Sequence, residues 1–217
     1  MNSYDLIARV YDANIDTTLH ALYIEMLERY AGGGDFLEIG CGSAVVAKHA
    51  TTLYEGVHAF DISPKMLDLA KGRLKHTHAK VFDHSMDTDL PQRYDMIVAA
   101  FDVFNHVQNE AEHIGLIKRW ANHLTPGGIL MFDVLHCAYV EGLDGYFETM
   151  SLQGEVLIWR ASSNGPCSVR HTFIARPLKA THTETAFPLS SVYSALGEYT
   201  VIKTVPLEER TIFIVKK

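Results

Sequence analysis

The sequence predicts an α/β fold in which a mostly parallel, seven-stranded sheet carries helices on both faces and an antiparallel β insertion is added to it. Two observations lead to this prediction. Between residues 35 and 135, short apolar strands alternate with helical stretches, which is how a parallel sheet is wound. One of these strands, residues 94–101, is almost continuously apolar, as a strand covered on both faces must be.

The elements are expected in a regular order. Residues 4–31 show apolar side chains at helical spacing until a run of three glycines ends the helix. Strands are then expected at residues 36–39, 57–60, 80–82, 94–101 and 129–134. Helices are expected at residues 44–53, 64–74 and 110–124, and a Pro-Gly-Gly turn at 126–128 precedes the fifth strand.

After residue 146 the alternation of strands and helices ends, because β segments follow one another without a long helix between them. Antiparallel pairing is expected for residues 146–160, 168–176 and 179–187. A short helix at 189–196 and two strands, 199–205 and 210–216, then return to the edge of the main sheet. The chain is therefore predicted to form a single domain over 1–217, with N-terminal helices at 1–31, a core of 35–135 and 189–217, and an insertion at 146–187.

Composition limits the classes of partner. The 217 residues are 47% hydrophobic and 21% charged, as in an ordinary globular domain. A formal net charge of −7 provides no basic field to attract a polyanion, so nucleic acid is not expected as a partner. The longest apolar runs are too short to span a bilayer, and the N-terminus lacks the pattern of a signal peptide. The expected location is the cytoplasm, with no membrane partner.

The cysteines and histidines do not predict a metal site. Cys41, Cys137 and Cys167 are odd in number and lack metal-ligand spacing, which favours a reducing compartment over a disulfide scaffold. The chain has twelve histidines, but no HxH or HExxH pair lies on a predicted helix or strand. The pair His76 and His78 falls in an expected loop.

A glycine turn marks a nucleoside site. The segment EIGCGS at residues 38–43 lies where a buried strand turns into a helix, and glycines there let the backbone approach a ligand closely. Val45 occupies the third position of a GxGxxG pattern, so the dinucleotide fingerprint fails. Glu38 suits a cationic ammonium better than a phosphate. The expected ligand therefore carries an amine.

Asp61 supports the same interpretation. It ends the second strand, 21 residues after Gly40, which is the spacing at which an acidic side chain reaches ribose hydroxyls. Ser63 and Pro64 then begin the next helix as its N-cap and first residue. Either feature alone is equally consistent with ordinary turn chemistry. Together they predict a nucleoside-binding turn.

Four segments, LEIGCGSA, FDISPKMLDLAKGRL, LPQRYDMIVAAFDVFNHV and LTPGGILMFDV, resemble the successive motifs of class I S-adenosylmethionine (SAM)-dependent methyltransferases. The resemblance runs from about residue 4 to 134 and implies a Rossmann-like fold with SAM as the cofactor. The opening YDLIARVYD, residues 4–12, is similar to the start of small bacterial methyltransferases that act on small molecules. In that family this helix forms a lid over the SAM site.

The resemblance also implies which residues hold the cofactor. It places Glu38, Gly40 and Gly42 at the methionine moiety, Asp61 on the ribose and Ile62 against the adenine. The full set is Tyr4, Tyr11, Glu38, Gly40, Gly42, Asp61, Ile62, Met66, Ser85, Met86 and Phe101. Relatives commonly carry Asp where this chain has Ser85, so either Ser85 or Asp83 is expected to meet the adenine amino group.

Methyl transfer is an in-line displacement that needs orientation, exclusion of water and, for an acidic acceptor, removal of a proton. Polar residues at the ends of the fourth and fifth strands would face the ligand crevice of such a sheet. The predicted catalytic residues are His106 as base, Asn105, Asp102, His136 and Tyr11, with Asp133 beside His136. The structural alternatives are that His106 caps a helix and that the tyrosines simply pack.

Two residues of the insertion, His182 and Glu184, alternate onto one strand face and line either an acceptor pocket or a solvated surface. The leading function is methyl transfer from SAM to a nitrogen or oxygen of a small-molecule acceptor. One alternative is attack on the aminocarboxypropyl carbon of SAM, with release of methylthioadenosine. Another is a non-catalytic SAM-binding module. The sequence leaves a homodimer open.

Overall fold

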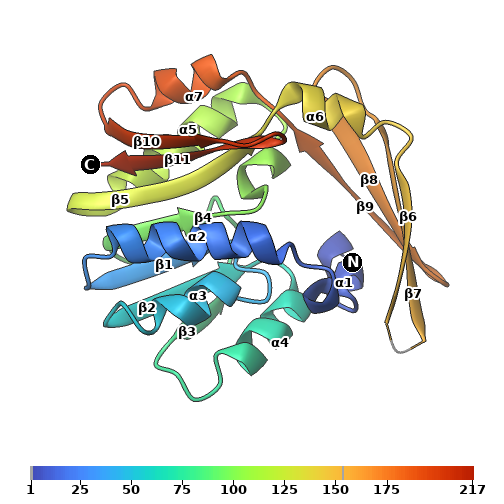
Figure 1. Cartoon of the computed structure of the whole chain (residues 1–217), viewed down its shortest axis with the longest axis horizontal. Coiled ribbons are helices and arrows are strands. Elements are labelled where there is room, and N and C mark those ends of the chain that lie inside the picture. The colour runs from blue at the N-terminus through green and yellow to red at the C-terminus, as the bar shows by residue number, and fades with distance from the viewer. Residues whose placement is uncertain (1, 153) are drawn as a thin grey trace.

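The computed structural model describes residues 2–152 and 154–217 and contains a seven-stranded sheet with helices on both faces (Figure 1). The strand order is β10-β11-β5-β4-β1-β2-β3. The five strands from β1 to β5 pair in parallel, whereas β11 runs antiparallel to both β5 and β10. The predicted α/β class, the mostly parallel sheet and the edge position of the last two strands are confirmed.

The elements of this sheet lie close to their predicted positions. Its strands are β1 (Asp35–Ile39), β2 (Gly56–Asp61), β3 (Lys80–Asp83), β4 (Tyr94–Ala99), β5 (Leu124–Leu135), β10 (Thr200–Pro206) and β11 (Arg210–Lys216). The helices between them are α3 (Val45–Ala50), α4 (Pro64–Arg73), η2 (Val103–His106), α5 (Glu110–Asn122) and α7 (Leu189–Ala195). The Pro-Gly-Gly segment at 126–128 lies within β5 rather than before it.

The N-terminal segment that the sequence predicts to be helical contains three separate helices. The segment consists of α1 (Ser3–Ile7), the short helix η1 (Tyr11–Ala13) and α2 (Thr17–Tyr30). A new helix starts at residue 17 because the Asp16 carboxylate accepts hydrogen bonds from the amides of Thr18 and Leu19. The Asn14 side chain donates to the carbonyl of Val10 and stabilises the bend before it.

Helices cover the two faces of the sheet in two groups (Figure 1). Buried side chains of α2, α3 and α4 pack on one face in a cluster with Phe36 and Met96. Buried side chains of α5 and α7 pack on the other, where Trp120 lies against Phe104 with ring centroids 4.4 Å apart. The strand β4 is buried almost throughout, as its apolar sequence predicts. No helix within the described ranges has the length and hydrophobicity to cross a membrane.

The insertion is a separate four-stranded antiparallel sheet in the order β6-β7-β8-β9 (Figure 1). Its strands are β6 (Phe147–Leu152), β7 (Glu155–Ser163), β8 (Ser168–Ala175) and β9 (Leu178–Thr185), so the β segment expected at 146–160 is two paired strands. A short helix that the sequence did not predict, α6 (Cys137–Gly142), leads into it. The N-terminal segment packs on this sheet, where Leu6 and Val10 join Leu157 and Phe173 in one buried cluster.

The expectation that no disulfide forms is wrong. Cys137 at the start of α6 is bonded to Cys167 in the turn before β8, with Cα atoms 4.6 Å apart. Cys41 is free and buried. The two bonded cysteines are 30 residues apart in the sequence, and only the return of the insertion to the core brings them together. The bond fastens the β7–β8 turn of the insertion to the start of α6, which directly follows β5.

Candidate functional site

A cavity of about 260 Å³ lies at the carboxyl ends of β1, β2 and β4, between the core, α1 and β9. We call it the nucleoside cavity. All eleven residues that the sequence predicts to hold a cofactor line this cavity. They are Tyr4, Tyr11, Glu38, Gly40, Gly42, Asp61, Ile62, Met66, Ser85, Met86 and Phe101. Asp83 does not belong to the lining, so the structure favours Ser85 over Asp83 at this wall.

The glycine turn leaves no space for side chains. Gly40 and Gly42 have φ values of +64° and +51°, a backbone conformation that disfavours other residues. A Cβ at Gly40 would lie 2.5 Å from the side chain of Val103, and a Cβ at Gly42 would lie 3.2 Å from the Tyr11 hydroxyl. The turn therefore presents bare backbone to the cavity.

Glu38 provides a buried carboxyl at the floor of the cavity. One of its oxygens accepts a hydrogen bond of 2.8 Å from the amide of Ala47 in α3. Burial raises the pKa of Glu38 to about 8, because a lone carboxylate loses its hydration there. A cationic group bound beside Glu38 would favour the charged form. The site thus fits an ammonium, as the sequence predicts.

Asp61 is held by backbone groups on two sides. Its carboxylate accepts hydrogen bonds of 2.9 Å from the amide of Gly42 and 2.8 Å from the amide of Ser63. Burial raises the pKa of Asp61 above its ordinary value. The hydroxyl of Ser63 donates to Asp5 of α1, so the N-terminal helix is fastened to this turn. The carboxylate therefore faces the cavity in a fixed position.

Three aromatic side chains form the other end of the cavity. The Tyr4 hydroxyl lies 2.9 Å from Nε2 of His106, and the Tyr4 ring stacks on His182 with centroids 5.3 Å apart. Burial lowers the pKa of His106 to about 4, because a charged imidazole would be desolvated. His106 is therefore neutral at pH 7 and has a lone pair available to accept a proton.

Behind His182 lies a buried chain of hydrogen bonds. Nε1 of Trp159 donates to Nδ1 of His171 over 2.9 Å, so Nε2 of His171 carries the proton that it shares with Glu184 over 3.1 Å. The other oxygen of Glu184 lies 3.3 Å from Nε2 of His182. Burial alone would raise the pKa of Glu184, but hydrogen bonds from the two histidines outweigh it and hold the pKa below its usual value. Glu184 is thus a buried anion.

Three of the predicted catalytic residues lie outside the cavity lining. Both ends of the buried Asn105 amide are bonded to backbone, with Thr185 accepting and Leu135 donating. His136 is bonded to the carbonyl of Glu208 and to the hydroxyl of Thr211. These contacts join β5, β9 and β11. The structure gives these two residues a structural role and no contact with the cavity.

Asp102, the third, belongs to a buried charge network together with Asp133. Nη1 of Arg210 lies 2.8 Å from Asp102 and 3.3 Å from Asp133, which is fully buried. Asp133 also accepts hydrogen bonds from the Tyr23 hydroxyl and from the amides of Phe101 and Asp102. Those two residues have φ values of +63° and +70°. The network therefore holds a strained turn that places Phe101 in the cavity wall.

Sequence reasoning missed two contributors to the site. His20 of α2 lines the cavity and stacks on Phe101 with ring centroids 4.1 Å apart. Nothing in the local sequence distinguishes this histidine from a surface residue. His171 pairs directly across the sheet with His182. The register of the β8–β9 hairpin would have revealed this pair.

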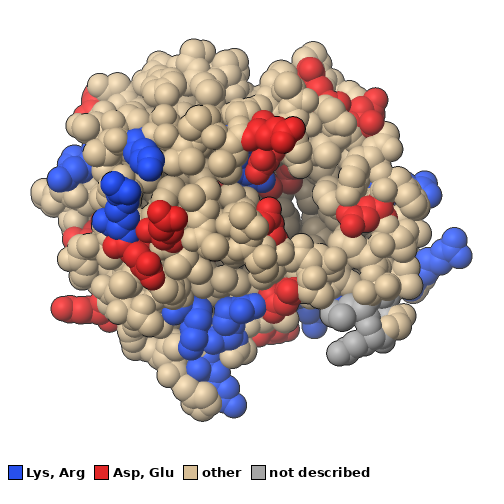
Figure 2. All heavy atoms as spheres, in the orientation of Figure 1, with Lys and Arg blue, Asp and Glu red and all other residues tan. Residues whose placement is uncertain are grey.

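The molecule is hollowed between the core and the insertion, and acidic side chains border this hollow (Figure 2). Glu184, Asp102 and Glu209 lie close enough to Tyr139 to raise the pKa of its hydroxyl, after the larger effect of burial. Arg210 opposes them and lowers this pKa. Acidic side chains therefore outnumber basic ones around Tyr139.

Comparison with known proteins identifies the family. A family model described as a methyltransferase domain matches residues 11–179, which is well over half of the chain. A dTDP-3-amino-3,6-dideoxy-alpha-D-glucopyranose N,N-dimethyltransferase from Streptomyces fradiae is 24% identical over 98 residues, or 45% of this chain and 38% of that protein. The chain spans less than half the length of the curated relatives it matches.

Solved structures share the whole fold at low identity. An S-adenosylmethionine-dependent methyltransferase from Clostridium acetobutylicum superposes with a TM-score of 0.82 at 19% identity, covering 99% of each chain. The sugar N-methyltransferase KedS8 from Streptoalloteichus sp superposes with a TM-score of 0.75 at 20% identity, covering 100% of this chain and 93% of that one. Together with the family match, the nucleoside cavity and its glycine turn show that the chain belongs to the methyltransferase-domain family.

Proposed function

We propose that this protein is a SAM-dependent methyltransferase that acts on a nitrogen or oxygen of a small-molecule acceptor. When bound, SAM supplies a methyl group on a cationic sulfonium that a nucleophile attacks in line. The observation that carries the proposal is the nucleoside cavity, with Glu38 and Asp61 at one end and the neutral His106 at the other. The groups proposed to bind the methyl donor and the base proposed for the acceptor thus line the same cavity.

The chain offers a group for each part of SAM. Glu38 would pair with the ammonium, and Asp61 would accept hydrogen bonds from the ribose hydroxyls. The bare backbone at Gly40 and Gly42 lines the cavity and would let the methionine moiety approach the turn closely. Ile62, which is 56% exposed, offers an apolar surface to the adenine ring.

His106 would serve the acceptor. Its neutral imidazole takes the acceptor proton, which general-base catalysis requires within hydrogen-bond reach. Tyr4 now holds that nitrogen with its hydroxyl, so the acceptor replaces Tyr4 at this position. The acidic side chains that border the hollow (Figure 2) favour an acceptor that carries an amine, which must be unprotonated when it attacks. The names of the dimethyltransferase from Streptomyces fradiae and of KedS8 also favour transfer to nitrogen.

The leaving nucleoside tests this proposal directly. The protein is incubated with SAM and a panel of small amines, amino sugars and phenols, and the nucleoside released is identified by mass spectrometry. S-adenosylhomocysteine together with a methylated acceptor is the expected result. Release of methylthioadenosine would mean attack on the other carbon of SAM and would overturn the proposal. Retained SAM with no product from any acceptor would favour a binding module.

Asp61→Ala is expected to weaken SAM binding about 10- to 100-fold, because it removes charge-assisted hydrogen bonds worth about 1.5–3 kcal/mol. Isothermal titration calorimetry measures this change. The matched control is Asp68→Ala on the exposed side of α4, which should bind SAM like the unaltered protein. Equal SAM affinities for the two variants, with unchanged circular dichroism spectra, would show that Asp61 does not bind SAM.

SAM affinity is expected to rise by up to about tenfold per pH unit from pH 6 toward pH 8. In the free protein Glu38 stays protonated below its pKa of about 8, and it must lose this proton to pair with the ammonium. Calorimetric SAM titrations in buffers of different ionisation enthalpy measure the proton that Glu38 releases on binding. Glu38→Gln should bind weakly with no rise over this range. A flat profile in the unaltered protein would show that Glu38 is already ionised.

A further inference from the structure

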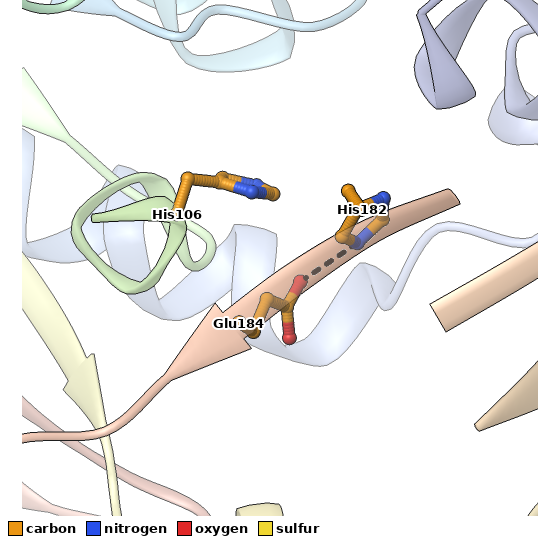
Figure 3. A group of neighbouring side chains, drawn as sticks. All are labelled: His106, His182 and Glu184. Atoms are coloured by element: carbon orange, nitrogen blue, oxygen red, sulfur yellow. Dashed lines mark hydrogen bonds and ion pairs between the residues drawn. The ribbon is translucent and has the colours of Figure 1, made fainter. Parts of the chain in front are cut away.

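Two histidines and one glutamate converge at the aromatic end of the nucleoside cavity (Figure 3). His182 and Glu184 lie two residues apart on β9, so their side chains share one face of the strand. His106 reaches toward them from η2, which belongs to the core (Figure 3). One potential ligand atom from each residue lies within 4.8 Å of the other two.

One of the ligand distances and one of the ring separations match the geometry of a metal coordination tetrahedron. Zinc binds imidazole nitrogen and carboxylate oxygen at about 2.0–2.2 Å, which separates two tetrahedral ligand atoms by about 3.3 Å. Nε2 of His182 and Oε1 of Glu184 are 3.3 Å apart. Two imidazoles on one such ion have ring centroids about 5 Å apart by the same geometry. The rings of His106 and His182 have centroids 5.0 Å apart.

The three side chains have the chemistry of metal ligands. Each offers an imidazole nitrogen or a carboxylate oxygen, which are the atoms that zinc binds. Nε2 of His182 would exchange its hydrogen bond to Glu184 for the ion, and Nδ1 would then carry the ring proton toward the hydroxyl of Ser3. The buried carboxylate of Glu184 would attract the cation.

Other side chains already orient two of the proposed ligands through hydrogen bonds. A metal-binding histidine usually donates its other N–H to a nearby acceptor, and the hydroxyl of Ser3 lies 2.8 Å from Nδ1 of His182. The second oxygen of Glu184 is fixed by His171, which Trp159 orients in turn. Such outer contacts hold ligands in one geometry before the ion arrives.

We propose that His106, His182 and Glu184 form a site for one divalent transition-metal ion of the Zn²⁺ or Co²⁺ type. His106 and His182 line the nucleoside cavity, so the fourth coordination position faces the space next to Tyr4. Three protein ligands and an open position are typical of zinc sites that bind a small molecule. An oxygen or nitrogen of the acceptor is the expected fourth ligand. Occupancy of the site would convert His106 from a free base to a ligand.

The inference does not depend on methyl transfer, because the protein and the metal alone suffice to test it. The full chain, stripped with a chelator and dialysed, is titrated with CoCl₂ and followed by visible absorption. One saturable equivalent with the strong bands of four-coordinate Co²⁺, displaced by ZnCl₂, is the expected result. His182→Ala, Glu184→Gln and His106→Asn should each weaken binding by more than about 100-fold, as expected when one of three ligands is lost.

The matched control is the double variant His76→Ala/His78→Ala, which removes two histidines outside the cavity lining and should bind Co²⁺ like the unaltered protein. SAM titration and circular dichroism confirm that each variant is folded. No saturable Co²⁺ binding by the unaltered protein would overturn the inference. Binding that survives all three ligand substitutions, or that is lost only in the control, would place the ion elsewhere and overturn it too. The methyl-transfer proposal would stand in either case, since SAM binding and product release are measured separately.

Discussion

Arg210→Met is expected to lower the free energy of unfolding by about 3–5 kcal/mol, because removing one partner of a buried ion pair leaves an uncompensated charge. Asp133 is fully buried, and Arg210 is the cation that lies 3.3 Å from it. Methionine keeps most of the volume of the arginine stem, so the loss reflects charge more than packing. Urea unfolding followed by circular dichroism measures the change.

Two further variants separate charge from packing. Arg29→Met, at the exposed end of α2, should change the free energy of unfolding by less than about 0.5 kcal/mol. Adding Asp133→Asn to Arg210→Met removes the unpaired anion and should restore part of the stability. A double variant no more stable than Arg210→Met would contradict the electrostatic explanation.

His106→Asn is expected to lower kcat about 10²- to 10⁴-fold for the acceptor that the product screen identifies, because it removes the proposed base. SAM affinity should stay within about twofold, since Glu38 and Asp61 at the other end of the cavity are untouched. The assay contains a chelator, so that His106 is free of metal. Asparagine keeps a polar group in the cavity but cannot take a proton at neutral pH.

The matched control is His136→Asn, because His136 was predicted as catalytic but lies outside the cavity lining. Its kcat should fall less than tenfold. In the unaltered enzyme with saturating SAM, protonation of His106 should lower kcat only as the pH falls through about 4, where this histidine becomes charged. An inflection near pH 6.5 that His106→Asn abolishes would mean that His106 is not desolvated during turnover.

The core and the cofactor end of the cavity could be predicted because their signals are local. The turn at Gly40 and Gly42 and the acidic residue Asp61 follow buried strands at a fixed spacing, and the parallel sheet brings those strand ends to one edge. The predicted residues therefore meet in one cavity. The single-domain organisation, the cytoplasmic location and the question of a homodimer stay predictions.

The acceptor end could not be predicted because its residues meet only through tertiary structure. His106 comes from the core, whereas His182 and Glu184 come from a strand of the insertion. His182 and Glu184 share one strand face, but nothing in the sequence indicates that His106 joins them, so no metal site is predicted. The disulfide between Cys137 and Cys167 escaped prediction for the same reason. Asn105 and Asp102 follow β4 as expected, but the turn there directs them toward backbone and Arg210.

The docking of α1 has a consequence for the order of events in turnover. Leu6 and Val10 pack on the insertion, while Asp5 holds Ser63 at the cofactor turn and Tyr4 holds His106. Residues 4–10 thus bridge the insertion and the core, with two hydrogen bonds to the core. For the proposed methyltransferase we expect this bridge to open for both cofactor and acceptor, so the rate of its opening would set an upper limit on turnover.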